Sequence, residues 1–308
     1  MKFIHDIAHS ELEPCVATIG FFDGVHIGHR FLIDQVKRLA TEKELKSLLI
    51  TFDTHPRQQS NPHWTPLLLT TNQEKKDLLV STGADYCLVL DFTPKVSHLS
   101  AKEFMEQVLK RYLNVKILLI GYDNRFGHNR EENFDDYVRY GKEIGIDVIR
   151  FTAYSIDGIN VSSSVIRNYL QHGAIEEANL RLGYEYFLDG VVVGGYRVGR
   201  TIGFPTANLQ IDNKLKLIPQ DGVYAVHLYL KGKQYIGMLN IGYRPTFNNV
   251  HQKTIEVHIL DFSSDIYNSS IRISFIKKIR GVKKFTSVEE LIEQLRMDEK
   301  EVRVLLNS

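Results

Sequence analysis

Two histidines three residues apart are the first candidates for chemistry, in the segment Gly20-Phe21-Phe22-Asp23-Gly24-Val25-His26-Ile27-Gly28-His29. An apolar, β-favouring run, residues 15–19, precedes this segment and an amphipathic run, residues 31–40, follows it, so a strand is expected to turn into a helix here. Side chains three apart at the start of a helix lie on one face, where the helix N-terminus already attracts an anion. The spacing therefore predicts a phosphate-binding site formed by His26 and His29.

A pair of the type His-x-x-His can also be half of a metal site, or simply structural. A zinc site is disfavoured because no glutamate lies between the two histidines and no cysteine cluster is near them. The glycines favour a ligand instead. Gly20 and Gly24 permit a tight turn, and Gly28 lets backbone approach a ligand with no Cβ in the way. Nucleotide binding is therefore the preferred interpretation of this segment.

A second candidate is the segment Val161-Ser162-Ser163-Ser164-Val165-Ile166-Arg167. Serines ahead of an apolar helical run are typical N-caps, and on its own the segment favours a helix start. Ser163 and Arg167 are four residues apart, however, which puts a hydroxyl and a guanidinium on one helix face, ready for phosphate. Both interpretations remain open at this point.

A glycine-rich stretch in the second half, Gly199-Arg200-Thr201-Ile202-Gly203-Phe204-Pro205-Thr206-Ala207-Asn208, carries the third set of candidates. Together with residues 194–198 it comes close to a P-loop. Arginine replaces the phosphate-binding lysine, however, and Gly203-Phe204-Pro205 stands where a P-loop needs a continuous helix. Thr206 and Asn208, two apart in an extended chain, would point the same way with hard oxygen atoms suited to Mg²⁺. We therefore reject a P-loop. The glycines would allow a mobile loop to approach phosphates, and a glycine- and proline-rich loop with a polar tail remains the alternative.

Alternating strand and helix patterns must position the first two candidates. Apolar runs at residues 15–19, 48–52, 86–90, 116–120 and 147–151 are separated by helix-like stretches at residues 73–82, 101–113 and 134–144. This alternation predicts a doubly wound parallel sheet of about five strands, with the site at the carboxyl ends of the strands. The fold class of the first half is therefore α/β.

The pattern changes after a short predicted helix, residues 174–182. Strands follow without intervening helices, and one helix, residues 288–306, closes the chain. This order predicts an antiparallel barrel with a terminal helix. The predicted strands are residues 187–193, 222–230, 234–241, 254–260 and 271–279. We place the domain boundary at Gly183, giving domains 1–183 and 184–308.

The order of these motifs resembles that of the bifunctional bacterial riboflavin kinase/FAD synthetase family. The resemblance covers nearly the whole chain and implies an N-terminal HxGH nucleotidyltransferase domain and a C-terminal six-stranded riboflavin kinase barrel. It implies that riboflavin is phosphorylated to FMN with ATP and Mg²⁺, and that FMN is then adenylylated to FAD with release of pyrophosphate. The same resemblance makes Glu256 the catalytic carboxylate near the riboflavin 5′-hydroxyl, although a lone glutamate in a strand is commonly a solvent-facing residue.

Residue roles follow from the same resemblance. The implied catalytic residues are His26, His29, Ser163, Arg167 and Glu256, with Thr206 and Asn208 as metal ligands. The implied nucleotide- and flavin-binding residues are Gly20, Phe21, Asp23, Gly24, Gly28, Asp123, Arg125, Ser164, Gly199, Arg200, Gly203, Pro205, Thr206, Asn208 and Arg244. Three positions depart from the family pattern: Asn124 replaces a phenylalanine, Tyr184 an arginine, and Val282 an acidic residue. Taken alone, the segment 121–127 that holds Asp123 and Arg125 would be interpreted as a plain turn.

Composition narrows the class of protein. The 308 residues are 43% hydrophobic and 24% charged, with a formal net charge of +1, which gives no overall attraction to nucleic acid or to an anionic membrane. Cys15 and Cys87 lie in apolar runs outside any CxxC pair and indicate buried thiols in a reduced compartment. No apolar run reaches the ~18 residues of a membrane span. We expect a cytoplasmic protein with small-molecule substrates, and leave transient self-association open.

Two other functions remain as alternatives. Asn124 and Tyr184 would also fit a riboflavin kinase whose adenylyltransferase half has decayed. A flavin-binding carrier without turnover is the third. The presence of Thr206, Asn208 and Glu256 together argues against a carrier, because binding alone needs no base beside a metal site.

Overall fold

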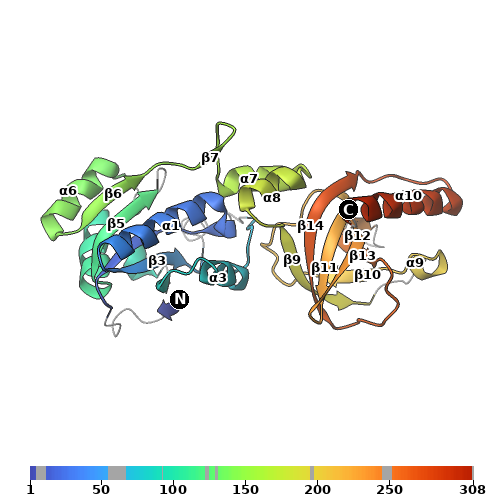
Figure 1. Cartoon of the computed structure of the whole chain (residues 1–308), viewed down its shortest axis with the longest axis horizontal. Helices are drawn as coiled ribbons and strands as arrows, with labels where there is room; N and C mark the ends of the chain where they lie inside the picture. The colour runs from blue at the N-terminus through green and yellow to red at the C-terminus, as the bar shows by residue number, and fades with distance from the viewer. Residues whose placement is uncertain are drawn as a thin grey trace. The chain divides into compact units, whose positions relative to one another are not determined.

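The computed structural model of the chain describes residues 1–4, 12–54, 67–91, 93–121, 125–128, 131–194, 198–244 and 252–306. It divides into two compact units, Met1–Ser163 and Ser164–Ser308 (Figure 1). Asp123 and Asn124 lie outside the described residues, and only the main chain of Arg244 is described. Among the described residues, no helix is both long enough and apolar enough to cross a membrane.

The first unit alternates strands and helices. Its strands are β1 (Lys2–Ile4), β2 (Cys15–Ile19), β3 (Lys46–Phe52), β4 (Tyr86–Leu90), β5 (Val115–Gly121), β6 (Asp147–Phe151) and the short pair β7 (Ser155–Ile156) and β8 (Ile159–Asn160). Its helices are η1 (Asp23–Val25), α1 (Ile27–Glu42), α3 (Asn72–Val80), α4 (Pro94–Ser97), α5 (Ala101–Glu103), the π-type η2 (Phe104–Tyr112) and α6 (Phe134–Ile144).

Six strands of this unit form one sheet in the order β1-β4-β3-β2-β5-β6, with every neighbouring pair parallel. The chain steps from β2 to β3 on one side and later places β5 on the other side of β2. In an open α/β sheet such a reversal leaves a crevice outside the carboxyl ends of the strands. The predicted histidine segment follows β2 directly and therefore lies at this reversal.

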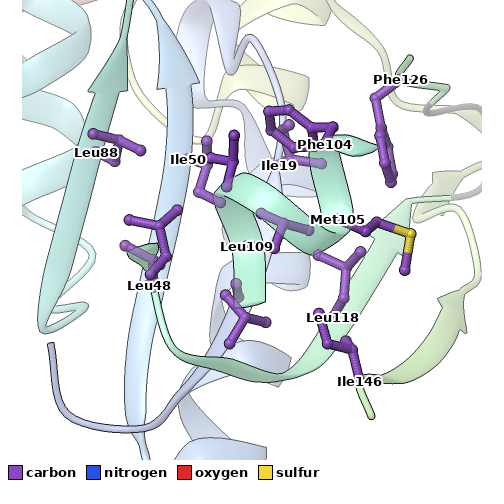
Figure 2. Packing of buried hydrophobic residues seen from close by; sticks show 14 of the residues in the cluster. Ile19, Leu48, Ile50, Leu88, Phe104, Met105, Leu109, Leu118, Phe126 and Ile146 are labelled. Atoms are coloured by element: carbon purple, nitrogen blue, oxygen red, sulfur yellow. The ribbon is translucent and has the colours of Figure 1, made fainter. Parts of the chain in front are cut away.

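Both faces of the central strands β2, β3 and β4 are buried, because successive strand side chains point to opposite faces and nearly all of them are covered. On one face, Val16, Leu32, Val36 and Ile117 pack together, which covers the sheet with α1. On the other face η2 supplies the cover. Figure 2 shows this second cluster, in which helical and strand side chains meet: Phe104, Met105, Leu109, Ile19, Leu48, Ile50, Leu88 and Leu118.

The five predicted strands of the first unit are all present, with ends within two residues of prediction, and the predicted α/β class is confirmed. The sixth strand, β1, was not predicted. Its three residues, Lys2–Ile4, are too few to show a period-two pattern, and they pair with β4 at the edge of the sheet. The helix predicted at residues 134–144 is matched residue for residue by α6.

The second unit begins with two helices and continues as a closed barrel. Its helices are α7 (Ser163–Gln171), whose first residue is the last of the first unit, α8 (Ile175–Leu182), α9 (Val198–Thr201) and α10 (Val288–Leu306). The barrel strands are β9 (Phe187–Val193), β10 (Ala207–Gln210), β11 (Gly222–Leu230), β12 (Lys233–Arg244), β13 (Gln252–Ile259) and β14 (Ser270–Arg280). They close in the order β10-β13-β12-β11-β14-β9, and all pairs are antiparallel.

The predicted six-stranded antiparallel barrel with a terminal helix is thereby confirmed. Lys231 and Gly232 join β11 to β12 with φ of 48° and 77°, the left-handed pair that a tight hairpin requires. The strand that was not located in advance is β10, which lies at the end of the glycine-rich stretch. The helix α9 covers only Val198–Thr201, so no continuous helix follows the stretch as a P-loop would need.

The division by packing falls after Ser163, the first residue of α7, whereas the predicted boundary at Gly183 falls after both α7 and α8. Asn179 of α8 explains why this helix packs with the barrel. Its side-chain amide donates to the carbonyl of Phe275 on β14 at 2.8 Å, and its Oδ1 accepts from the N–H of Tyr186 at 2.8 Å.

Helix α10 packs on the outside of the barrel and is tied to it by a buried ion pair. Asp298 is 1% exposed, and its carboxylate accepts hydrogen bonds from Nε and Nη2 of Arg280 at 2.9–3.0 Å. The side chain of Gln294 donates a further bond to Asp298 at 2.9 Å. The pair thus fixes the end of β14, from which the next loop departs, against α10.

Removing the carboxylate should destabilise the barrel strongly. We expect Asp298→Ala to lower the free energy of unfolding of the barrel by about 3 kcal/mol. This value is at the lower end of the cost of breaking a buried ion pair, because the Arg280 guanidinium keeps partial access to water. Replacing both partners, as Arg280→Met with Asp298→Leu, should cost less, since no buried charge is left alone. Hydrogen–deuterium exchange of β11–β14 peptides in increasing urea measures both. A double variant as unstable as Asp298→Ala would contradict this account.

Candidate active sites

The turn between β2 and α1 is held in a strained conformation. Phe22 and Val25 have φ of 54° and 36°, a region that residues other than glycine rarely adopt and that is least suited to β-branched valine. Gly24 between them has φ of 79°, which glycine adopts without cost. Strain of this kind persists only where neighbouring groups hold it in place.

Asp23 is the group that holds the turn. It is 3% exposed, and its carboxylate accepts from the N–H of Leu69 at 2.9 and 3.1 Å, and from the N–H and hydroxyl of Thr70 at 3.1 and 3.2 Å. The hydroxyl of Thr70 in turn accepts from the N–H of Gly24 at 3.1 Å. Asp23 was predicted to bind nucleotide. In the structure its carboxylate faces the protein interior and shapes the loop, and direct contact with a nucleotide stays a prediction.

The two histidines lie against each other. His26 is the N-cap of α1, and its Nδ1 accepts from the backbone N–H of His29 at 3.2 Å, which leaves the proton of the neutral ring on Nε2. The rings stack with centroids 3.6 Å apart and planes within 17°. The edge of Phe22 packs on His29 at 5.2 Å. The predicted common face of the two imidazoles is therefore present at the first turn of the helix.

Burial lowers the pKa of His29 well below its ordinary value, and the neighbouring His26 and Lys75 add to this effect. The ring is consequently neutral near pH 7, and a neutral imidazole still offers one N–H to an acceptor. Within the described part of the chain, Nδ1 of His29 has no hydrogen-bond partner. A buried polar atom without a partner at a helix start fits a site that is completed by a ligand.

The serine segment, at the C-terminal end of the first unit, contacts the histidine turn. The hydroxyl of Ser163, the first residue of α7, donates to the carbonyl of Asp23 at 2.8 Å. At Gly28, an added Cβ would lie 3.2 Å from Nδ1 of His26 and 3.3 Å from the carbonyl of Val161. Glycine at position 28 therefore lets the histidine segment and the serine segment approach closely without pushing these neighbours apart. The structure brings Ser163 to the histidine turn, although its hydroxyl serves here as a structural donor.

The remaining predicted residues of this half are more scattered. Ser164 and Arg167 follow Ser163 in α7, and Nη1 of Arg167 donates to the hydroxyl of Ser164 at 3.3 Å. Arg125 is exposed and lines a cavity of about 200 Å³ with Asn133 and Arg150, beside the end of β5. The N–H of Gly20 donates to the carbonyl of Ile50 at 2.9 Å, which continues the sheet into the turn.

In the barrel, three polar side chains lie in one row. Asn208 of β10 stands opposite Glu256 of β13, and Glu256 stands opposite Asn240 of β12. Residues directly opposite in neighbouring strands share a face of the sheet. The hydroxyl of Thr206 lies 3.5 Å from Oε2 of Glu256. The predicted residues Thr206, Asn208 and Glu256 are therefore brought together, and Asn240 joins them.

Two cavities meet at Thr206. One, of about 330 Å³, is lined on its apolar side by Met238, Leu291 and Leu295 and on its polar side by Asn240 and Glu256, in the range of small-molecule sites. The other, of about 280 Å³, is lined by Arg200, Pro205, Thr206, Val257 and Ser263–Tyr267. Thr206 lines both cavities.

The loop between the two cavities depends on its glycines. A Cβ on Gly199 would collide with the carbonyl of Phe204, whose N–H donates to the carbonyl of Gly199 at 2.8 Å. Gly203 has φ of 87°, a conformation that favours glycine, and it therefore provides the turn. An added Cβ here would have no heavy atom within 4 Å, so the backbone conformation and not crowding selects glycine. Nδ1 of His258 donates to the carbonyl of Pro205 at 2.7 Å and holds the end of the loop against β13. Val282 lines the larger cavity and is 62% exposed.

The donors in this row fit a magnesium ion bound together with phosphates. Among the described residues, no group of three or more His, Cys, Asp or Glu side chains could hold a metal ion by itself. Thr206 and Asn208 supply neutral oxygens beside the Glu256 carboxylate, and Mg²⁺ commonly takes few protein ligands and completes its shell with water and phosphate oxygens.

Several residues at the sites were not singled out from the sequence. Thr70, Lys75, Asn240 and His258 belong to ordinary-looking segments, and their roles come from contacts with residues far away in the chain. The sequence gives a partial signal for Asn240: it lies two residues after Met238 in a predicted strand, so both side chains are expected on one face. In the structure both line the larger cavity.

Two family models match the chain. Residues 8–165 match the model described as FAD synthetase, and residues 182–306 match the model described as riboflavin kinase. The fold and the two sites thus define a chain that joins a nucleotidyltransferase sheet to a kinase barrel. The chain belongs to the family of bifunctional riboflavin kinase/FMN adenylyltransferases, as its sequence predicted.

Curated relatives agree with this membership, and a solved structure shares the fold. The bifunctional riboflavin kinase/FMN adenylyltransferase of Escherichia coli strain K12 is 36% identical over 300 residues, 97% of this chain and 95% of the relative. That of Listeria monocytogenes is 38% identical over 290 residues, 94% of this chain and 91% of the relative. A crystal structure from Streptococcus pneumoniae, described as a macrolide-efflux protein, has a TM-score of 0.89, 30% identity and 98% coverage of both chains.

Proposed function

We propose that this chain makes FAD from riboflavin in two steps, each in its own unit. The barrel transfers the γ-phosphate of ATP to riboflavin and yields FMN and ADP. The sheet unit transfers AMP from a second ATP to FMN and yields FAD and pyrophosphate. The observation that supports the proposal is that each unit has its own cluster of candidate phosphate-binding side chains: the stacked His26 and His29 in one, and Thr206 beside Glu256 in the other.

In the barrel, riboflavin would occupy the larger cavity and ATP the smaller one. Glu256 accepts the proton of the riboflavin 5′-hydroxyl. The hydroxyl oxygen forms a bond to the γ-phosphorus of ATP, and the bond between the γ-phosphorus and the oxygen that bridges it to the β-phosphate breaks. Thr206 and Asn208 would hold Mg²⁺, which supplies positive charge to the phosphate oxygens when bound. Residues of the loop from Gly199 to Pro205 line one or the other cavity and Thr206 lines both, so the γ-phosphate and the 5′-hydroxyl would meet beside Thr206.

In the sheet unit, a phosphate oxygen of FMN attacks the α-phosphorus of ATP, and the bond to the pyrophosphate oxygen breaks. No covalent bond to the protein is needed, so the protein contributes position and charge stabilisation. The N–H groups of the two imidazoles would stabilise the charge that grows on the α-phosphate and on the leaving pyrophosphate. Ser163 and Arg167 are proposed as further phosphate ligands, with Gly20, Phe21 and Gly28 in the binding loop.

Three finer points belong to the same proposal. The catalytic domains are proposed to divide at Gly183, which lies at the start of the segment matched to riboflavin kinase. We place the activity in the cytoplasm, where ATP and flavin nucleotides are used. Mg²⁺ is the metal proposed, and the partners are ATP, riboflavin and FMN.

Incubating the purified chain with riboflavin, ATP and Mg²⁺ and separating the flavins by chromatography tests both steps. We expect FMN to appear first and FAD to accumulate at its expense, with pyrophosphate released in step with FAD. FMN without FAD would indicate a kinase whose other half is inactive. Unchanged riboflavin and ATP after prolonged incubation would contradict both activities and favour a flavin carrier.

A further inference from the structure

A lysine is buried directly behind the histidine turn. Lys75 on α3 is 2% exposed, although an ammonium group loses much of its hydration on burial. Its Nζ donates to the carbonyl of Phe52, the last residue of β3, at 2.6 Å. The same Nζ lies 4.2 Å from the ring centroid of Phe21. An ammonium over an aromatic face within about 6 Å is attracted by the ring, most strongly where water is excluded.

These two contacts connect the turn to the sheet. Phe21 is the second residue after β2, and its carbonyl also accepts from the hydroxyl of Thr51 at 3.1 Å. Lys75 therefore joins the ring of Phe21 to the end of β3, at the carboxyl edge where the phosphates of a nucleotide are expected. Lys75 lies in the first turn of α3, and the residues just before this helix, Leu69 and Thr70, donate their N–H groups to the carboxylate of Asp23. One stretch of chain thus supports the strained turn at two points.

The charge of Lys75 acts on the same site. Burial lowers its pKa to about 8, against the opposing effect of nearby carboxylates, so the group is largely protonated at neutral pH. Its positive charge is one cause of the lowered pKa of His29. The ionisable groups that face it are Asp23 on η1, Asp53 after β3, Cys87 on β4, His29 on α1 and Lys76 on its own helix.

Given the adenylyl transfer proposed for this unit, we infer that Lys75 is a positioning residue for it. Lys75 fixes Phe21 and the backbone of the histidine turn and keeps a positive charge behind the triphosphate site. It acts through Phe21 and the turn, and the reacting atoms are handled by the histidines. Loss of the charge removes the cation from the ring of Phe21 and one hydrogen-bond donor from the carbonyl of Phe52 at the end of β3. The loop that receives ATP then moves, and small displacements in such a site have large effects on rate.

Three variants of the full chain test this role. Lys75→Met keeps the length and apolar stem of the side chain and removes the charge, whereas Lys75→Arg keeps the charge at every accessible pH. Lys37→Met is the matched control, because Nζ of Lys37 also donates to a backbone carbonyl, that of Thr82, at 2.6 Å, but on the flank of α1. The kcat/KM for FMN adenylylation is measured across pH, with riboflavin phosphorylation in the same chain as a control for intact protein.

We expect Lys75→Met to lower adenylylation kcat/KM about ten- to a hundredfold, while Lys37→Met and the kinase step stay unchanged. In the wild-type chain, kcat/KM should decline on the alkaline side with an apparent pKa of about 8, as Lys75 loses its proton. Lys75→Arg should retain activity and lack this decline, since arginine stays protonated. A merely structural lysine would lower thermal stability without moving the pH profile.

Two results would overturn the inference. One is a Lys75→Met chain that melts earlier but keeps the wild-type kcat/KM and pH profile. The other is a Lys75→Arg chain that keeps the alkaline decline, and this result decides the question even if Lys75→Met does not fold. A wild-type chain that forms no FAD would contradict the proposed function itself, whereas active wild type with unaltered variants contradicts only the role of Lys75.

Discussion

Replacing His29 by alanine is expected to reduce FAD formation from FMN about a hundred- to a thousandfold, while the same chain phosphorylates riboflavin at the wild-type rate. The loss is that of one preorganised donor to a developing phosphate charge in a site shielded from water. His29 is well placed for this, since its ring lies flat on His26 at 3.6 Å and its Nδ1 has no partner within the described residues. Adenylylation is measured as pyrophosphate released from ATP and FMN.

The stacking of the two rings sharpens this prediction. His29→Ala removes one ring and leaves His26 as the N-cap, and the N–H of residue 29 can still donate to Nδ1 of His26. His26→Ala removes a ring and the cap together, so it should also lower stability by about 1 kcal/mol. The control is His172→Ala, because His172 is exposed and lies between α7 and α8. If His29→Ala made FAD at the wild-type rate, the phosphate-binding role of the pair would be wrong.

Most of the sheet could be predicted from sequence because its central strands are buried on both faces. The run Cys15-Val16-Ala17-Thr18-Ile19 is fully buried, and such continuous apolar runs alternating with amphipathic helices have few other solutions than a parallel sheet. Strands of three or four residues were not predicted, because they are too short to show such a pattern. Both β1 and β10 are held by their neighbours more than by their own pattern, Lys2–Ile4 by β4 and Ala207–Gln210 by β9 and β13.

The supporting groups of the sites could not be predicted, because each is defined by a contact over a long sequence separation. Asp23 looked like a ligand, yet its carboxylate bonds to Leu69 and Thr70, 46 and 47 residues away. Lys75 stands in the polar run 72–77, where nothing in the sequence marks it, and only the fold brings it to the ring of Phe21. The residues that touch substrates leave local motifs in sequence, whereas the residues that hold those motifs in shape depend on the tertiary fold.

Converting Glu256 to glutamine is expected to reduce riboflavin phosphorylation about a hundred- to ten-thousandfold, the usual contribution of a positioned proton acceptor. FMN supplied directly should still be converted to FAD at the wild-type rate, since the sheet unit is unchanged. Glutamine keeps the size of the side chain and its place between Asn208 and Asn240, and it can still meet the hydroxyl of Thr206. The row across β10, β13 and β12 therefore stays intact, and only the ability to take a proton is lost.

The pattern of kinetic constants separates this role from a structural one. A lost base lowers kcat and kcat/KM together, whereas a distorted cavity raises the KM for riboflavin with less effect on kcat. Asn240→Ala is the comparison, because Asn240 shares the row and the larger cavity but carries no proton acceptor. It should chiefly raise KM. Initial rates of FMN formation over a range of riboflavin concentrations give kcat and KM for both variants. A Glu256→Gln chain with the wild-type kcat would show that Glu256 takes no part in the proton transfer and only lines the cavity.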